Sequence, residues 1–481
     1  MGISTRKAAS LFAICTLWVV PASAQQARIY VSSQAGDRLT AKPAVKFQAK
    51  RGGSTPATFT VDESARYQRI DGFGASFLES GSLTLNTLEP AAQEDVLKAL
   101  FDPQTGAGYS VMKTVLAGTD EMPAGPWYTY DETPGDVAME HFDISRDLGP
   151  AGEITYIKRA RRYGSFMLQA PMDFPPDWML ATVGKKPNGL PLLDVDPKYY
   201  DALALYYLRY LKEYEKNGVF IDYLSLFNER YTKITYPEID NLLKNHVGPL
   251  FAREHVRSQI QFREASSRQE AGKEYPTVLD DPGARKYVGS LAYHGYDFGN
   301  FSALAELHKR YPDLPLWMTE VCHTNAPIYE FSDGDFWGNQ LVSDLEAGAS
   351  AWIYWNMILN EKGGPWLVSI IHGDPDPNVQ QPIVVINRQT KEVTYTGLYY
   401  YLAHFSKFVR PGGVRIGTSG SHEGIRCIAF KGPNGDLVTE LLNSQKSDAQ
   451  VTLAWRRKEL SLTLPAISIS TVMWSSHKYP E

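Results

Sequence analysis

Two glutamates each close a short apolar run of the kind that forms a strand buried on both faces. Glu229 ends the run that starts at Tyr223, and Glu320 ends the run that starts at Leu316. In an α/β barrel the carboxyl ends of all strands open on one mouth, where the chemical groups sit. Two carboxyl groups at one mouth are the equipment that hydrolysis of a glycosidic bond requires. Taken singly, each glutamate could equally cap a strand or pair with a lysine.

Five further side chains fall at predicted strand ends and could bind a sugar beside this pair: Asp120, Asn228, His294, Tyr296 and Trp355. We expect Asn228 to bind the sugar next to the scissile bond, and Asp120 and His294 to bind hydroxyl groups. Tyr296 could donate to Glu320 and hold it ionised, while Trp355 could form the floor under the ring. The alternatives stay open. Tyr296 and Trp355 could belong to the core, His294 could be structural, and Asp120 could cap a helix.

Eight apolar runs alternate with helical patterns and predict the scaffold that carries these residues. The runs begin near Tyr67, Tyr109, Ser165, Tyr223, Gln259, Gly289, Leu316 and Ala349. The run Gln259–Glu264 is the weakest of them. The clearest helix spans about residues 197 to 217, with Asp196 as its cap and Gly218 after its end. Eight strands with helices between most of them indicate a (β/α)8 TIM barrel of the α/β class.

The pattern changes beyond Leu402, where short strands separated by turns predict an antiparallel β-sandwich side domain. Irregular short strands between residues 28 and 62 are expected to join it. We therefore divide the chain into a leader (1–24), N-terminal strands of the side domain (25–66), a catalytic barrel (67–401) and a C-terminal sandwich (402–481). The chain shows no low-complexity linker, so we expect the two domains to be docked.

The first 24 residues have the composition of a cleavable export signal. Arg6 and Lys7 precede an apolar stretch from Leu11 to Val20, and small residues at 22–24 form a cleavage site before Gln25. The apolar stretch is too short to span a bilayer, and no later stretch is long enough. We expect a secreted or periplasmic protein without a transmembrane segment.

Charge and composition narrow the class of partner. The full chain has 48 basic and 54 acidic residues, and removal of Arg6 and Lys7 leaves 46 against 54, a net charge of −8. Without a basic patch, nucleic acid is not an expected partner. Aromatic residues make up 12% of the chain, which suits a carbohydrate-binding cleft as well as a large core. We expect a carbohydrate or glycoconjugate substrate, and a monomer or weak oligomer.

The sequence carries no motif for a metal or a cofactor. It has no H-E-x-x-H spacing, and the glycines around Asp71 lack the third glycine of a dinucleotide fingerprint. An exported esterase would need a G-x-S-x-G turn between strand and helix, which is also missing. Cys322 and Cys427 lie too far apart in the chain to indicate a disulfide framework. We interpret Cys322, two residues past Glu320, as a small buried apolar residue.

A series of ordered segments along the mature chain matches one known family. They are Ile70–Gly74, Tyr128–Asp136, Asn228–Glu229, Asp281–Val288, His294–Tyr296, Thr319–Glu320, Trp355–Pro365, Tyr400–Phe408 and Val414–Ile416. The chain resembles glycoside hydrolase family 30, the family of the lysosomal glucosylceramidases. The resemblance implies a barrel with an attached β-sandwich and a retaining mechanism, with Glu229 as the acid/base and Glu320 as the nucleophile. It also implies that the five side chains named above line the sugar site.

Several positions depart from the glucosylceramidase pattern: Lys113 stands for an arginine, Met172 lies near a sugar-contacting tryptophan, Tyr354 stands for an aspartate, Arg230 stands for a proline, and the loop Ser369–Gln381 is longer. Exchange of arginine for lysine removes a bidentate fork. We therefore expect a retaining β-glycosidase whose sugar specificity is altered towards galactosyl, fucosyl or xylosyl groups. The alternatives are an endo-acting β-1,6-glucanase or galactanase on the same fold, or a non-catalytic carbohydrate-binding protein, against which both glutamates count.

Overall fold

The computed structural model describes residues 25–50, 57–119, 128–185, 191–229, 232–323, 329–365 and 379–476, together with Gly2. Two of the positions singled out above, Asp120 and Arg230, lie outside the described residues. The same holds for residues 3–24 of the expected export signal and for residues 366–378, which include most of the loop Ser369–Gln381.

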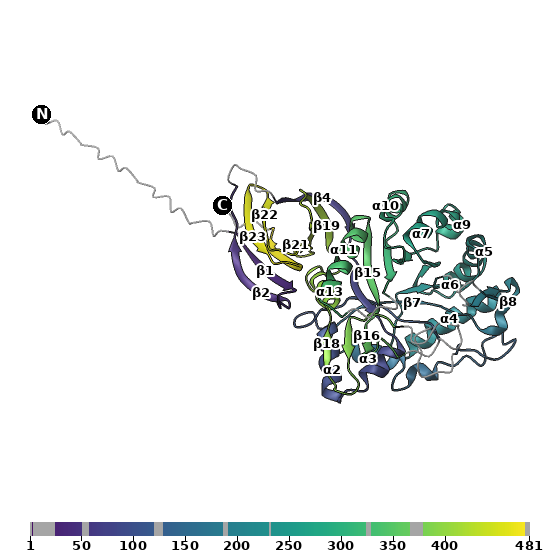
Figure 1. Ribbon diagram of the computed structural model, residues 1–481. Helices are drawn as coiled ribbons and strands as arrows, with labels where there is room; N and C mark the ends of the chain where they lie inside the picture. Colours follow the sequence, from purple (N-terminus) through teal and green to yellow (C-terminus); the bar gives the residue numbers. More distant parts are fainter. Residues whose placement is uncertain are drawn as a thin grey trace.

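Parallel strands form the centre of the larger domain (Figure 1). They are β5 (Gly72–Ser76), β6 (Val111–Lys113), β7 (Met167–Pro171), β10 (Tyr223–Ser225), β11 (Gln259–Gln261), β12 (Glu264–Ala265), β13 (Leu291–His294), β14 (Leu316–Glu320) and β15 (Ala349–Asn356). Their order in the sheet is β11-β10-β7-β6-β5-β15-β14-β13-β12. Strand β15 pairs with β5, so the last barrel strand lies beside the first. The predicted TIM barrel is confirmed.

The fifth barrel strand differs from the single run expected from the sequence. The run Gln259–Glu264 is not continuous, because it breaks between β11 and β12 at Phe262 and Arg263. The guanidinium group of Arg263 donates to the backbone carbonyls of Glu229 (3.2 Å) and Ile234 (2.8 Å). The break therefore turns an arginine towards the loop that follows β10, and this arginine supports the backbone of Glu229.

Helices surround the barrel on its outside (Figure 1). They are α1 (Glu79–Leu85), α2 (Pro90–Phe101), α3 (Glu153–Ala160), α4 (Tyr200–Lys216), α5 (Tyr236–Leu242), α6 (Gly248–Arg253), α7 (Arg268–Glu274), α8 (Pro276–Leu279), α9 (Pro282–Arg285), α10 (Phe301–Arg310) and α11 (Ser332–Glu346). The helix expected from residue 197 begins as a 3-10 turn at Pro197, and the side chain of Asp196 accepts from the backbone N–H of Lys198 (3.1 Å). Among the described residues, no helix is long and apolar enough to cross a membrane.

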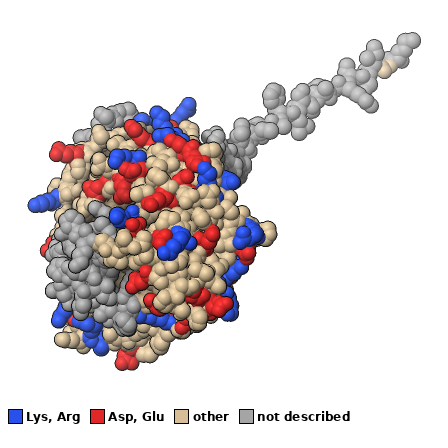
Figure 2. All heavy atoms as spheres, turned by 90° about the vertical axis from the view of Figure 1, so that its right-hand side faces the viewer, with Lys and Arg blue, Asp and Glu red and all other residues tan. Residues whose placement is uncertain are grey.

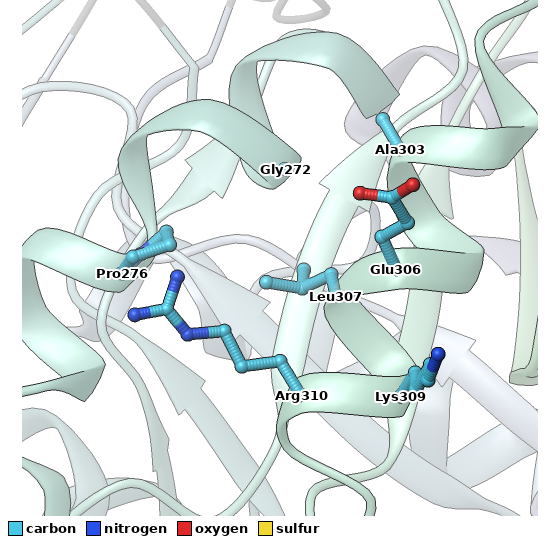
Figure 3. Close-up of a pocket in the computed structure, with 7 residues that line it drawn as sticks. All are labelled: Gly272, Pro276, Ala303, Glu306, Leu307, Lys309 and Arg310. Atoms are coloured by element: carbon cyan, nitrogen blue, oxygen red, sulfur yellow. The ribbon is translucent and has the colours of Figure 1, made fainter.

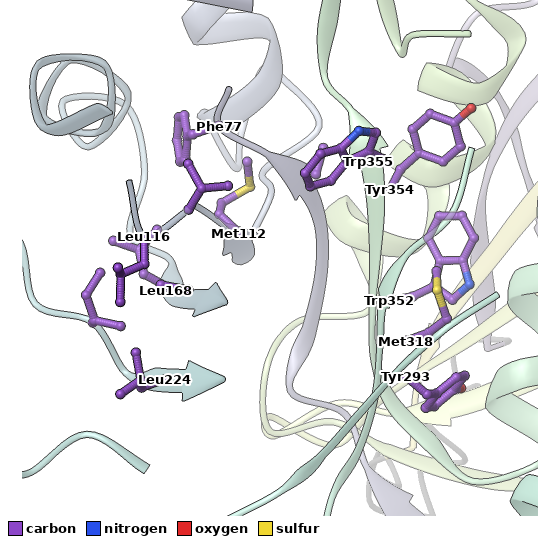
Figure 4. Packing of buried hydrophobic residues seen from close by; sticks show 14 of the residues in the cluster. Phe77, Met112, Leu116, Leu168, Leu224, Tyr293, Met318, Trp352, Tyr354 and Trp355 are labelled. Atoms are coloured by element: carbon purple, nitrogen blue, oxygen red, sulfur yellow. The ribbon is translucent and has the colours of Figure 1, made fainter. Parts of the chain in front are cut away.

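Strand periodicity sorts the barrel side chains into two sets. Outward residues such as Met112, Leu168, Leu224, Met318 and Trp352 belong to the large core between strands and helices (Figure 4). A separate small cluster consists of Val111, Trp317, Ala351 and Ile353. Because successive residues on a strand face opposite sides, the position two residues after a member of this second set faces the same side, one layer nearer the mouth. Lys113, Thr319 and Trp355 occupy such positions.

The smaller domain consists of one ten-stranded sheet built from both ends of the chain (Figure 1). Its strands are β1 (Gln26–Ser33), β2 (Thr40–Lys46), β3 (Gln48–Ala49), β4 (Thr58–Arg69), β19 (Val414–Ser419), β20 (Ile425–Lys431), β21 (Asp436–Asn443), β22 (Ala449–Trp455), β23 (Lys458–Leu464) and β24 (Ser468–Ser475). The first strand pairs with the last of these strands over six residue pairs, from Arg28–Met473 to Ser33–Ser468. Two short sheets complete the fold: β8 (Leu180–Lys185) with β9 (Pro191–Val195), and β16 (Ile358–Asn360) with β17 (Val384–Ile386) and β18 (Val393–Tyr395).

Helix α13 (Gly397–Phe408) joins the two domains. The ring of Phe405 lies 5.7 Å from Phe73 of barrel strand β5 and 6.5 Å from Phe430 of β20, measured between ring centroids. Next to it in the helix, the buried imidazole of His404 contacts the hydroxyls of Thr471 (2.6 Å) and Ser32 (2.9 Å). The domain boundary expected at residue 402 falls inside this helix, because its buried face continues to Phe405.

We predict that replacing Phe405 by alanine weakens the docking of the two domains. Phe405 is fully buried between them, so the loss of its ring should lower the free energy of unfolding by about 3 to 5 kcal/mol. Chemical denaturation followed by tryptophan fluorescence measures this change. Val137→Ala is the control, since that side chain is 54% exposed and should change stability by less than about 0.5 kcal/mol. Equal stability of the two variants would contradict the prediction.

Candidate active site

A single imidazole lies between the two glutamates at the mouth of the barrel. His294, the last residue of β13, has its Nδ1 atom 3.2 Å from Oε2 of Glu229 and its Nε2 atom 3.6 Å from Oε2 of Glu320. Glu320 ends β14, and Glu229 follows β10 by four residues. Both carboxyl groups are mostly buried, with 19% of the side chain of Glu229 and 7% of that of Glu320 accessible to solvent. The strand ends therefore bring the two sequence-predicted glutamates together.

Both oxygens of Glu320 accept a hydrogen bond. Lys113 Nζ lies 2.8 Å from Oε2, and the hydroxyl of Tyr296 donates to Oε1 over 2.8 Å. The expected hydrogen bond between Tyr296 and Glu320 is thus present. Burial raises the pKa of Tyr296 well above its ordinary value, so the hydroxyl keeps its proton and remains a donor. A carboxyl group that accepts hydrogen bonds at both oxygens is suited to be ionised, because a protonated carboxyl group would use one oxygen as a donor.

A third carboxyl group, that of Glu264, lies behind this pair and is completely buried. Its Oε2 atom is within hydrogen-bonding distance of Lys113 Nζ (3.0 Å), His294 Nε2 (2.9 Å) and Thr319 Oγ1 (2.6 Å). Its Oε1 atom accepts from Gln169 Nε2 over 2.5 Å. Burial alone would raise the pKa of Glu264, but Lys113 and the hydrogen bonds from His294 and Thr319 outweigh it and lower the pKa to about 2. Glu264 is therefore a permanent anion.

The two basic groups of the site, His294 and Lys113, have raised pKa values. Burial would lower the pKa of His294, but Glu320 and the contacts with Glu229 and Glu264 outweigh it and raise this pKa to about 10. Burial would likewise lower the pKa of Lys113, and the charges of Glu264 and Glu320 raise it above its ordinary value instead. Both side chains are therefore cations at neutral pH, and both ring nitrogens of His294 carry protons.

Two more of the sequence-predicted residues meet at Lys113. Oδ1 of Asn228 lies 3.3 Å from Lys113 Nζ, and the ring centroid of Trp355 lies 4.9 Å from the same atom. Both side chains are almost fully buried. His294 and Tyr296 thus contact the glutamates directly, and Asn228 and Trp355 lie at the lysine that contacts Glu320. Asp120 lies outside the described residues.

Of the four positions expected to alter sugar recognition, the structure places Lys113 in the site. Tyr354 was expected there and is not: it extends from β15 to the side opposite Trp355 (Figure 4), and its hydroxyl donates to the backbone carbonyl of Gln381 (3.1 Å). Strand alternation is the reason, since neighbours on a strand face opposite sides. Met172 is fully buried, and its backbone carbonyl accepts a hydrogen bond from the backbone N–H of Asn228 (2.8 Å). Arg230 lies outside the described residues.

Glu264, Gln169 and Thr319 also belong to the site and were not expected there from the sequence. A signal existed, because Glu264 closes an apolar run as Glu229 and Glu320 do. It was obscured by the break in the fifth strand. Cys322, by contrast, is a buried free thiol as expected, and its Sγ atom lies 3.3 Å from Gln380 Oε1.

Other features of the described residues do not compete with this site. They contain no group of three or more His, Cys, Asp or Glu side chains arranged to hold a metal ion. A pocket of about 600 Å³ lies between α7, α8 and α10 on the outside of the barrel (Figure 3). It is lined by Gly272, Pro276, Ala303, Glu306, Leu307, Lys309 and Arg310, which are not part of the cluster at the mouth. Acidic and basic side chains are interspersed over the barrel face seen in Figure 2.

Comparison with known proteins gives matches over most of the chain. Residues 70–409 match the glycosyl hydrolase family 30 TIM-barrel domain, and residues 412–472 match the β-sandwich domain of the same family. The mouse lysosomal acid glucosylceramidase is 26% identical over 473 residues, covering 92% of this chain and 88% of the relative. An endo-1,6-β-D-glucanase of Neurospora crassa is 26% identical over 490 residues, covering 94% and 98%.

Solved structures agree on the fold. SrfJ from Salmonella typhimurium superposes with a TM-score of 0.84 at 22% identity, covering 94% of this chain and all of that one. The structure of the endo-β1,6-glucanase BT3312 gives a TM-score of 0.81 at 23% identity, covering 94% of this chain and 99% of that one. Both the barrel and the β-sandwich are thus matched by family and by fold, and the chain belongs to glycosyl hydrolase family 30 and is a glycoside hydrolase.

Proposed function

We propose that this protein is an exported retaining β-glycosidase that works through Glu320 as nucleophile and Glu229 as acid/base. The observation that carries the proposal is the placement of His294 between the two carboxyl groups, with Glu320 held by Lys113 and Tyr296. One carboxylate is thus surrounded by donors, while the other retains more contact with solvent. This asymmetry is what a nucleophile and a proton donor need.

In the first step, Glu320 attacks the anomeric carbon of the β-glycoside and forms a covalent glycosyl ester. Glu229 gives its proton to the glycosidic oxygen as the bond to the aglycone breaks. His294 Nδ1 occupies one oxygen of Glu229, Oε2, at 3.2 Å. The proton to be transferred is therefore carried by the other oxygen, Oε1.

In the second step, the ionised Glu229 removes a proton from water, and the water attacks the anomeric carbon. Glu320 leaves as a carboxylate and returns to its contacts with Lys113 and Tyr296. Two inversions restore the β-configuration. Asn228 and Trp355 lie beside Lys113, where they would contact the sugar bound at Glu320.

We predict that the first sugar released from a β-glycoside is the β-anomer. The physical reason is that each displacement inverts the anomeric carbon and two displacements restore it. Proton NMR of a fresh reaction mixture distinguishes the anomeric protons before mutarotation. If the α-anomer appears first, the roles assigned to Glu229 and Glu320 are wrong.

A second prediction separates the roles of the two glutamates. Glu320→Gln should abolish turnover, because no glycosyl ester can form. Glu229→Ala should lower kcat by about 100-fold or more on poor leaving groups and much less on activated phenols, which need little protonation to depart. Azide should partly restore Glu229→Ala and yield a β-glycosyl azide.

The control for both variants is Glu306→Gln, which changes an exposed glutamate of α10 outside the site. It should keep the activity of the unmodified enzyme. Azide rescue of Glu320→Gln to the β-azide, rather than of Glu229→Ala, would reverse the assignment.

A third prediction concerns the sugar. Lys113 contacts Glu320, Asn228 and the ring of Trp355, and it lacks the bidentate fork of arginine. We therefore expect at least one of the aryl β-galactoside, β-fucoside and β-xyloside to have a higher kcat/KM than the aryl β-glucoside. A panel of 4-nitrophenyl β-glycosides measures this, and a clear preference for glucose would contradict it.

Endo-1,6-β-glucanase activity is the second candidate, because the Neurospora crassa relative of that name matches nearly the whole length of both chains. Digestion of linear β-1,6-glucan discriminates the two candidates. An endo enzyme releases a ladder of oligosaccharides, whereas an exo-acting glycosidase releases only monosaccharide or leaves the polymer intact.

A further inference from the structure

We propose that Glu264 is a positioning residue of this active site, which acts on both glutamates through Lys113 and His294. The inference rests on the proposed function, because it assigns to Glu264 a part in the two-step reaction of Glu320 and Glu229. The carboxyl group itself is completely buried behind the pair.

The contacts of Glu264 support a role beyond filling space. One oxygen, Oε2, is shared by three donors from three different strands: Lys113 of β6, His294 of β13 and Thr319 of β14. Lys113 then contacts Glu320 at 2.8 Å, and His294 contacts Glu229 at 3.2 Å. One buried atom therefore orients the group that holds the nucleophile as well as the group that holds the acid/base.

The sum of the charges on these groups stays the same through the two steps of the proposed reaction. Lys113 and His294 are the two cations, and Glu264 is the fixed anion. Before the reaction, the second negative charge is on Glu320 and Glu229 is protonated. In the glycosyl ester the charge of Glu320 is gone, and ionised Glu229 supplies the second negative charge. Glu264 thus balances one of the two positive charges. The other is balanced by a second negative charge, which the two catalytic glutamates carry in turn.

The remaining groups near Glu264 leave this assignment unchanged. Asp173, after β7, adds a negative charge that also raises the pKa of Lys113. Tyr275 and Tyr296 are buried, which raises the pKa of each well above its ordinary value, so both stay neutral. Gln169 is uncharged and donates to Oε1.

The test variant is Glu264→Gln, which keeps the shape of the side chain and removes its charge. Its amide oxygen can take the place of Oε2, and its amide nitrogen can donate to Gln169, whose Oε1 atom is buried without a hydrogen bond among the described residues. Loss of the negative charge removes a repulsion that acts on the mobile negative charge of the catalytic pair. A reaction that needs one ionised and one protonated glutamate gives a bell-shaped profile of kcat/KM against pH. In Glu264→Gln we expect both limbs of this profile to move to lower pH, by about 1 to 3 units.

Two further variants separate charge from structure. Glu264→Asp keeps the charge but withdraws it from its three donors, so kcat should fall by about 100-fold while the two limbs stay close to their original pH. Glu153→Gln is the matched control. Glu153 of α3 is another buried glutamate of the barrel domain, away from the contacts of Lys113 and His294 described above. Burial raises its pKa well above its ordinary value, and its Oε2 atom accepts from Thr114 Oγ1 over 3.4 Å. The exchange should leave the pH profile unchanged.

A second readout does not depend on turnover. In protein labelled with ¹⁵N-histidine, the resonances of His294, assigned by their loss in His294→Asn, should show a doubly protonated ring at pH 8. In Glu264→Gln the same ring should lose its proton at a lower pH than in the unmodified protein. This measurement works even if the protein cleaves none of the glycosides tested, so it distinguishes failure of the inference from failure of the proposed function.

If in Glu264→Gln both limbs of the kcat/KM profile move to lower pH and His294 loses its proton at a lower pH, the positioning role is supported. Reduced activity with unmoved limbs and an unchanged titration of His294 would mean that Glu264 is only structural and would overturn the inference. A profile that moves equally in Glu153→Gln would also overturn it, since the shift would then not come from the charge of Glu264.

Discussion

The site depends on the burial of one ammonium group. Lys113 is completely inaccessible to solvent, and an ion moved from water into a protein interior costs several kcal/mol unless it is paired and hydrogen-bonded. Three acceptors surround its Nζ atom: Glu264, Glu320 and Asn228. Loss of any one of them would leave the buried ammonium group with less negative charge nearby or with an N–H group that lacks an acceptor, so the nucleophile and its neighbours hold one another in place. The need to pair buried charges also fixes His294, because it is the second cation on the shared oxygen of Glu264.

Strand periodicity places these groups. An apolar layer that includes Val111 and Trp317 fills the barrel below them, and the positions two residues further along β6 and β14 carry Lys113 and Thr319. A polar layer on an apolar one keeps water away from the lower side of the ion cluster, which strengthens every charge interaction in it. The ten-stranded sheet, which is built from segments near both ends of the chain, meets the barrel through α13 and stabilises it from outside.

Much of this arrangement follows from the sequence, and the exceptions have physical causes. The barrel and its strand ends are predictable, because runs such as Leu316–Glu320 are apolar, short and followed by polar residues. Tyr354 was misplaced because a family pattern gives the position of a residue but not the side of the strand it faces. Glu264 was missed because the fifth strand is split into pieces of three and two residues, too short for a clear pattern. Which donors share one carboxylate oxygen depends on contacts between strands far apart in the chain, and no local pattern carries that information.

The exchange of arginine for lysine at position 113 is consistent with the geometry of its surroundings. An ammonium group has three N–H donors, and Lys113 has three acceptors at 2.8 to 3.3 Å, with the face of Trp355 on a further side. A guanidinium group has five N–H donors in one plane and needs more acceptors in that plane. The compact charge of lysine therefore suits a cluster in which one oxygen of Glu264 already serves two other donors. Because the same ammonium group contacts Glu320, Asn228 and the ring of Trp355, it links the charge of the nucleophile to two side chains proposed to contact the sugar.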